Sequence, residues 1–373
     1  MINIFVIYPT GINVILRNIC FLCAILWTAS NAATVQYKSL LDFQSQSRVF
    51  RGFGGDIDCR TLTRLPTKVE SVNFYSDRRS SVIDPLLYKR FLELRKVVAD
   101  EEDFLARTNT KFVSAPVISR TAIADCLRTH LLKFATDDAF VASDDIRGGG
   151  AVRLMSVTPL MSYLLLRDGS RITEADDNEI RAWIQRLMSR LLWLEAKYKY
   201  DNNIEDWTAA AFALGAVALN QPELLEHALS VVRKKAGAIT ADGVLPQEVA
   251  RGAMGVEYSL SATQALALVI AVAQANGTNI LAQPEGAPIL RMMQRMVKTI
   301  NDPQSFLALT DEPGAIAPEH FDRQVMGWLE IYYRQTRDPE ALRAICARRP
   351  LYSWRTGGDW FVFFGHPDQC QSK

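Results

Sequence analysis

Two nearly uncharged, alanine-rich stretches constrain the fold of this chain more than any other feature of its sequence. They cover residues 207–219 and 262–275, and each is long enough for roughly three to four turns of helix. A helix that is apolar on most of its sides has to be surrounded by other elements. We therefore expect a core in which further helices pack around these two.

The flanking sequence also has a helical pattern. Asp84 and Pro85 form an N-cap followed by a proline in the first turn, and Thr173 caps a stretch to Lys197 with apolar residues every three or four positions. Only the tail, residues 354–364, fits an extended segment. About ten helices joined by short loops predict an all-α fold of paired helices arranged in a ring. The other expected helices cover residues 118–135, 151–166, 222–235, 287–300, 318–336 and 339–348.

The N-terminus has the pattern of a secretory signal peptide. An apolar run at residues 19–27 follows Arg17 and precedes small residues. The run is shorter than the roughly 20 apolar residues that a membrane-spanning helix needs, although an uncleaved anchor is the alternative. We expect removal of residues 1–32 and a periplasmic or secreted protein without membrane attachment. Residues 33–373 would form a single domain that begins with an irregular arm over residues 33–80.

The composition excludes several classes of protein. The 42 Lys and Arg residues balance 41 Asp and Glu residues, which argues against a polybasic nucleic-acid-binding protein. The glycines at 148–150 do not follow a strand and lack the Lys-Ser/Thr of a phosphate-binding loop. Four cysteines lie beyond the signal peptide, an even number that suits two disulfides in an oxidising compartment. None of the four has CxxC spacing, so zinc is not expected. These cysteines are Cys59, Cys126, Cys346 and Cys370.

Two polar segments each precede a buried helix. Residues 201–206 would gather at a helix N-terminus, whose free N–H groups attract carboxylates, although Asn202 or Asn203 could simply cap that helix. Arg251 and Tyr258 lie seven residues apart, and on one helix they would share a face about 10 Å apart along its axis. A guanidinium beside a phenol lowers the pKa of the phenol. The alternative is a surface pair between Arg251 and a glutamate.

Together these segments resemble the alginate (poly-mannuronate) lyase family, which has the α/α-toroid fold. The resemblance covers about residues 70–365. It is carried by Gly243-Val-Leu-Pro-Gln-Glu-Val-Ala-Arg251 through Tyr258, by Asn202-Asn203-x-x-x-Trp207, by Asp125-Cys126-Leu127, by Ala273-Gln-Ala-Asn-Gly277, by Trp328-Leu-Glu330 and by Arg355-x-Gly-Gly-Asp359.

The resemblance implies β-elimination on an acidic polysaccharide without a metal or organic cofactor. We expect the protein to be a monomer. Asn203 and Arg251 would neutralise the C6 carboxylate, so that the C5 proton becomes acidic enough to remove. Tyr258 would deliver a proton to the departing O4. The family's lid tyrosine corresponds to Tyr75 or Phe74, with two arginines, Arg78 and Arg79, close by. Further substrate contacts are expected from Asn202, Trp207, His130, Phe134, Tyr75, Glu248 and Arg355.

The sequence departs from the family pattern around these residues. Ile204 stands where the family has a histidine, and Asp206 stands where an aromatic residue is expected. Ser259 and Ser261 replace a histidine and a tyrosine. Isoleucine can neither neutralise a carboxylate nor accept a proton, so Tyr258 is left as both base and acid.

Three hypotheses follow. The chain is a lyase that works on a polyuronate, a non-catalytic polyuronate-binding protein, or a glycoside hydrolase. The hydrolase would need a pair from Glu205, Asp206 and Glu248 about 5–10 Å apart across a cleft.

The resemblance also implies a disulfide between Cys59 and Cys126, which would tie the irregular arm to the helices and stabilise the fold by about 4 kcal/mol. Cys346 and Cys370 would form the second pair.

Overall fold

The fold is described from a computed structural model that covers residues 36–52, 57–61, 63–310 and 323–370. The chain divides into two compact units, Met1–Gln36 and Tyr37–Lys373, and everything below concerns the second. The predicted signal peptide lies outside the described residues, as do residues 318–322 of one expected helix.

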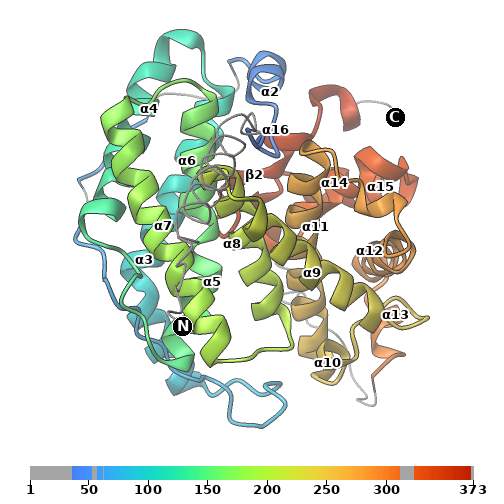
Figure 1. Ribbon diagram of the computed structural model, residues 1–373. Coiled ribbons are helices and arrows are strands. Elements are labelled where there is room, and N and C mark those ends of the chain that lie inside the picture. Colours follow the sequence, from blue (N-terminus) through green and yellow to red (C-terminus); the bar gives the residue numbers. More distant parts are fainter. Residues whose placement is uncertain (1–35, 53–56, 62, 311–322, 371–373) are drawn as a thin grey trace, which may run out of the picture. The chain divides into compact units, whose positions relative to one another are not determined.

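The described part is helical with one short pair of strands, which confirms the all-α prediction (Figure 1). The antiparallel strands pair Tyr352 with Asp359 and Ser353 with Gly358. The elements are α2 (Phe43–Val49), α3 (Pro85–Ser114), α4 (Val117–Thr136), α5 (Ile146–Met155), α6 (Val157–Asp168), α7 (Glu174–Lys197), α8 (Asn203–Leu219), α9 (Pro222–Ala238), α10 (Pro246–Val249), η1 (Gly252–Met254), α11 (Gly255–Ala275), η2 (Ile280–Ala282), α12 (Gly286–Asn301), α13 (Gln304–Leu307), η4 (Arg323–Val325), α14 (Trp328–Thr336), α15 (Pro339–Arg348), β1 (Tyr352–Ser353), β2 (Gly358–Asp359), α16 (Trp360–Phe364) and η5 (Pro367–Cys370).

The two alanine-rich stretches form α8 and α11, and they are the centre of the fold. They pack against each other, and nearly all their side chains are buried. In Figure 1, α3, α4, α6 and α7 lie on one side of this pair, and α12, α14 and α15 lie on the other, while α9 packs mainly against α8. Small alanine side chains let two helices approach closely, which explains why these stretches occupy the middle.

Two local predictions are wrong. The arm over residues 33–80 is not wholly irregular, because Asp42 caps the short helix α2 by accepting a hydrogen bond from the Ser45 N–H. The tail over residues 354–364 is extended only at the two-residue strand β2, and its last five residues are helical. Asp359 caps the apolar helix α16, whose aromatic side chains turn into the core.

Both expected disulfides are present. Cys59 is bonded to Cys126, which joins the arm to α4, and Cys346 is bonded to Cys370, which joins α15 to η5.

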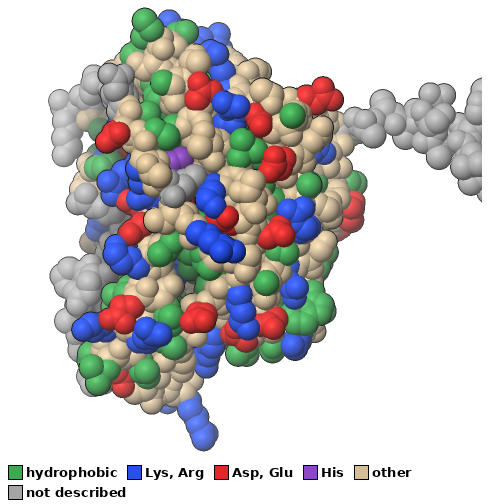
Figure 2. Space-filling view, turned by 90° about the vertical axis from the view of Figure 1, so that its left-hand side faces the viewer, with side chains coloured by type: hydrophobic (Ala, Val, Ile, Leu, Met, Phe, Trp, Pro, Cys, Tyr) green, Lys and Arg blue, Asp and Glu red, His purple; other side chains and the backbone are tan. Residues whose placement is uncertain are grey.

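Charges of both signs are mixed on the surface beside α3, α4 and α7. Figure 2 shows this face, where basic and acidic side chains are interspersed and neither sign forms a continuous area. On that face the distribution agrees with the balanced net charge.

Candidate active site

A cavity of about 280 Å³ opens where the N-terminal ends of α8 and α11 meet α3, α5 and the segment before α3. Asn203, Arg251 and Tyr258 all line it. Of the other residues expected to contact substrate, Asn202, Tyr75 and Arg355 line it too. Residues that lie far apart in the sequence therefore meet at one site.

Arg251 lies at a break in the helical pattern. The stretch around it is not one helix: α10 ends at Val249, η1 begins at Gly252 with a left-handed φ of 61°, and α11 begins at Gly255. This break turns the guanidinium back over Tyr258, with its Cζ atom 3.6 Å from the centroid of the tyrosine ring. A cation over the face of an aromatic ring is attracted to it.

The direction expected for the pKa of Tyr258 is wrong. Burial raises this pKa well above its usual value, and the nearby Arg355 only partly opposes the shift. The guanidinium of Arg251 lies over the ring face. Tyr258 is therefore a protonated phenol at neutral pH, ready to act as an acid, and it must lose that proton before it can act as a base.

Glu248 was expected to contact substrate, but it does not line the cavity; it is buried and interacts with Asn203 and Arg251 instead. Its carboxylate is fully buried. Its Oε1 accepts a hydrogen bond of 3.0 Å from the backbone N–H of Asn203, and its Oε2 lies 3.7 Å from Nη1 of Arg251. Burial raises the pKa of Glu248, while Arg251 and the Asn203 N–H lower it.

His130 and Phe134 do not face the cavity. They follow Cys126 by four and eight residues, so all three share one face of α4, and that face is turned inward. His130 is buried with its Nδ1 2.5 Å from Oε1 of Glu101, and Phe134 packs against the ring of Trp183 at a centroid distance of 5.4 Å. The prediction that both contact substrate is therefore wrong.

Trp207 is also a core residue. It is fully buried in α8, and its indole N–H donates a 2.9 Å hydrogen bond to the hydroxyl of Ser261 in α11. This bond joins the two central helices beneath the cavity. The expectation of a direct sugar contact from Trp207 is wrong.

The three carboxylates considered for glycoside hydrolysis do not line the cavity. Glu205 is paired with Lys234 and Lys235, while Asp206 and Glu248 are fully buried. Among the residues that line the cavity, Glu257 is the single carboxylate. A pair of carboxylates facing across the cleft is therefore missing from the described residues, and the hydrolase hypothesis loses its basis.

Two arginines of the cavity wall had not been identified from the sequence. Arg95 and Arg147 line the cavity along with Arg251 and Arg355. Arg95 is buried, its Cζ is 5.1 Å from the ring centroid of Phe91, and burial lowers its pKa to about 10. In the sequence it resembles any arginine on an amphipathic helix. Four guanidinium groups around one cavity favour an anionic ligand.

The segment that covers the cavity is a tight turn. An isolated bridge pairs Tyr75 with Ile83, and both side chains line the cavity. Inside the turn the carboxylate of Asp77 accepts hydrogen bonds from three backbone N–H groups. These bonds lower the pKa of Asp77 to about 2, and the bond from the Val82 N–H contributes most. The donors are Arg79, Ser81 and Val82, at 2.8–2.9 Å.

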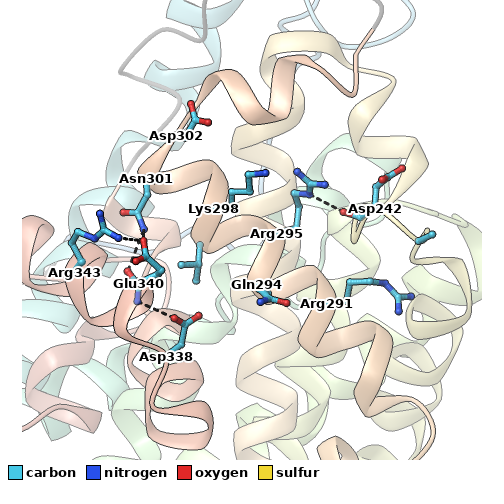
Figure 3. A pocket seen from close by; sticks show the side chains of 12 residues that line it. Asp242, Arg291, Gln294, Arg295, Lys298, Asn301, Asp302, Asp338, Glu340 and Arg343 are labelled. Atoms are coloured by element: carbon cyan, nitrogen blue, oxygen red, sulfur yellow. Dashed lines mark hydrogen bonds and ion pairs between the residues drawn. The ribbon is translucent and has the colours of Figure 1, made fainter.

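A larger groove of about 610 Å³ lies between α12 and α15 (Figure 3). It contains none of the expected site residues. Its arginines are engaged locally: Arg291 and Arg295 donate from Nε to backbone carbonyls of the loop before α10, at 3.1 and 2.8 Å, and Arg343 pairs with Glu340. Size alone does not identify the chemical site in this molecule.

One group of side chains has the spacing of metal ligands. Atoms of Cys59, Cys126 and His130 lie within 4.8 Å of one another. The two sulfur atoms are bonded to each other, so they do not offer the thiolates that a metal would need.

The sequence is similar to alginate lyases. A family model described as alginate lyase matches residues 121–306. The alginate lyase of Pseudomonas aeruginosa strain PAO1 is 26% identical over 292 residues, which are 76% of this chain and 78% of that protein. The alginate lyase of Cobetia marina is 23% identical over 76% of this chain and 77% of that protein.

The fold is similar to that of solved alginate lyases. Alginate lyase A1-III from Sphingomonas species A1 gives a TM-score of 0.73 at 18% identity, covering 90% of this chain and 98% of that one. A tyrosine-to-phenylalanine variant of alginate lyase A1-III complexed with tetrasaccharide gives a TM-score of 0.75 at 18% identity, covering 88% and 96%. The predicted α/α toroid is confirmed. The family model, the relatives and the fold agree, and the chain belongs to the alginate lyase family of polysaccharide lyases.

Proposed function

We propose that this protein cleaves an alginate-like polyuronate by β-elimination. One observation carries the proposal: the amide residue Asn203, the guanidinium of Arg251 and the phenol of Tyr258 line the same cavity. The additional arginines around them suit a polyanionic chain. The tetrasaccharide complex of a protein with the same fold supports a sugar chain as the ligand.

In the proposed reaction, Asn203 and Arg251 neutralise the C6 carboxylate of one sugar. Preorganised donors of this kind stabilise the negative charge that develops when the C5 proton leaves. The phenolate of Tyr258 takes that proton, the C5 electron pair forms the C4–C5 double bond, and the C4–O4 bond breaks. The new phenol then gives its proton to O4, which restores the phenolate.

We assign both proton transfers to Tyr258. Ile204 lines the cavity, we place it at the position of the family's histidine, and its side chain cannot carry a proton. One residue that both removes and donates a proton needs the C5 hydrogen and O4 on the same face of the sugar. We therefore propose a substrate with that stereochemistry.

A non-catalytic polyuronate-binding protein is the second candidate, and the isoleucine at position 204 is the observation that favours it. Such a protein would keep the arginine-lined cavity and lose turnover.

The test is a screen of acidic polysaccharides with the wild-type protein, followed by ultraviolet absorbance. A lyase forms a double bond conjugated with the carboxylate, which absorbs in the ultraviolet. A hydrolase would give reducing ends without this absorbance, and a binding protein would give neither.

Tyr258→Phe should abolish the absorbance, because the variant has no group to transfer the proton. Tyr333→Phe makes the same chemical change in α14, away from the cavity, and should keep wild-type rates. Turnover by Tyr258→Phe at the wild-type rate would exclude Tyr258 from the mechanism.

We also propose that the protein acts as a monomer in the periplasm or outside the cell, after loss of residues 1–32. The two disulfides support an oxidising compartment.

A further inference from the structure

A compact group of side chains that does not line the cavity surrounds the Cys59–Cys126 disulfide. Cys126 and His130 lie four residues apart on α4 and share one face of that helix, while Cys59 comes from the arm. One ligand-type atom from each of the three residues lies within 4.8 Å of the others. Donors around a tetrahedral zinc ion are separated by roughly 3.5–3.8 Å, given bonds of about 2.0–2.3 Å. The three donors are therefore gathered at about the span of one ion.

His130 has the hydrogen bonding of a metal ligand. Its Nδ1 lies 2.5 Å from Oε1 of the buried Glu101. Its Nε2 is buried and has no hydrogen-bond partner within the described part of the chain. An imidazole that binds a metal commonly pairs one ring nitrogen with a carboxylate, which fixes the ring and leaves the other nitrogen for the ion. A buried polar atom without a partner calls for an explanation, and a ligand role for Nε2 supplies one.

Arg60 holds its neighbour Cys59 beside His130 independently of the disulfide. Nη2 of Arg60 donates a 2.6 Å hydrogen bond to a backbone carbonyl of α3 and lies 3.0 Å from Oε2 of Glu101. Its Cζ lies 4.7 Å from the ring centroid of Phe104. The same ring stacks on the imidazole of His130, at a centroid distance of 4.4 Å. These contacts do not involve sulfur, so Cys59 stays at the site when the disulfide is reduced.

We propose that Cys59, Cys126 and His130 form a zinc site when this disulfide is reduced by a dithiol. The exposed Cys59 is the sulfur that a reductant reaches, because Cys126 is buried. A thiolate of the dithiol attacks Sγ of Cys59, and Cys126 leaves as a thiolate. The second thiol of the reductant then releases Cys59, and the reductant becomes a disulfide.

Zinc binds the two sulfurs as thiolates together with Nε2 of His130, and the two thiol protons pass to solvent. Three protein ligands leave the fourth tetrahedral position to water. Thiolate and imidazole are the ligands that zinc prefers, which makes zinc the expected metal. The ion and the disulfide are thus alternative links between the arm and α4, one for reducing and one for oxidising conditions. The proposal is independent of the proposed lyase activity.

The experiment compares metal binding by the oxidised and the reduced wild-type protein. A phosphine reduces the disulfides and is removed by gel filtration without oxygen. Zinc alone is then titrated by calorimetry, and cobalt(II) alone by absorption spectroscopy. We expect one zinc ion per reduced chain, thiolate-to-cobalt charge-transfer bands, and a higher unfolding temperature of the reduced protein with zinc. The oxidised protein should show none of these.

Paired serine variants assign the site to one of the two disulfides. The variant with Cys346→Ser and Cys370→Ser should bind zinc like the reduced wild-type protein. The variant with Cys59→Ser and Cys126→Ser should not bind it. Reduced wild-type protein that takes up no more metal than this second variant would overturn the proposal. Loss of the helical circular dichroism on reduction, before metal is added, would also overturn it, because Cys59 would then not be held in place.

Histidine variants test the third ligand. His130→Gln keeps a hydrogen-bond donor for Glu101 but removes the ring nitrogen, and zinc binding should weaken by more than tenfold. Glu101→Gln should weaken binding by about 10- to 100-fold, because it acts through the orientation of the ring. His227→Gln makes the same change at a histidine that pairs with Glu195 instead, and should leave binding unchanged. Wild-type affinity in His130→Gln would contradict the site. If that variant does not fold, the serine variants decide the question.

Discussion

Ile204 lines the cavity, and in our proposal it takes the place of the family's histidine. Its Cδ1 lies against α5, where a Cβ atom added to Gly150 would come within 3.7 Å of it. The side chain thus gives an apolar wall to a cavity whose other walls carry arginines. Substrate choice should therefore depend on this position.

Ile204→His should increase kcat/KM on polymannuronate by about tenfold or more, because a donor near the C6 carboxylate stabilises the developing charge. The increase is measured as the initial rate of ultraviolet absorbance. Ile204→Val keeps the wall apolar and should match the wild-type rate. A histidine variant no faster than wild type would show that the rest of the cavity decides substrate choice.

The burial of Tyr258 predicts an alkaline pH optimum. The pKa of this phenol is raised, so the phenolate fraction increases about tenfold with each pH unit throughout the neutral range. Because the phenolate is the base, kcat/KM should rise with pH over the same range. A pH–rate profile of the wild-type protein tests this, and a profile that falls from neutral to alkaline pH would contradict it.

At the residue scale, the sequence predicted only part of the candidate site. Asn203, Arg251 and Tyr258 share a cavity as their motifs suggested. His130 and Trp207 are buried instead, because a motif gives residue type and order, whereas packing decides which face of a helix turns inward.

At the scale of elements, hydrophobic patterning predicted the buried helices correctly, since their apolar character needs no knowledge of partners. It failed where the chain changes direction. The break around Arg251 depends on Gly252 at positive φ. It also depends on Gly255, where an added Cβ would come within 2.4 Å of the Glu248 carbonyl oxygen. Such a close approach is visible only once the elements are assembled.

The two disulfides should contribute unequally to stability. Cys59 and Cys126 are 67 residues apart, while Cys346 and Cys370 are 24 apart. The chain-entropy model gives about 4 kcal/mol for the longer loop and about 3 kcal/mol for the shorter one. Replacing each pair with serines and measuring denaturant unfolding tests the order. A larger loss from the 346–370 pair would contradict it.

On the scale of the whole molecule, positive charge is concentrated at the cavity although the net charge is close to zero. Arg95, Arg147 and Arg355 line it together with Arg251, while Figure 2 shows mixed charges on the face beside α4. An anionic polymer would therefore be attracted to this cavity.

This attraction predicts a KM that rises several-fold between ionic strengths of about 0.01 M and 0.1 M, because the Debye length shortens from about 30 Å to about 10 Å. Steady-state kinetics at several salt concentrations measure it. Arg147→Gln should flatten the dependence, whereas Arg291→Gln, in the groove of Figure 3, should not. A KM that does not change with salt would count against the arginine-lined cavity as the binding site.

The turn that carries Tyr75 over the cavity is shaped by its own carboxylate, that of Asp77. Backbone N–H groups of the turn donate hydrogen bonds to this carboxylate and lower the pKa of Asp77 from 3.8 to about 2. Their stabilising effect is therefore fully present above that range, and it is lost only as the pH falls through it. A turn fixed in this way has lost its conformational freedom during folding, and an arriving sugar does not have to order it. Association with the polymer is then not slowed by a conformational change of this loop.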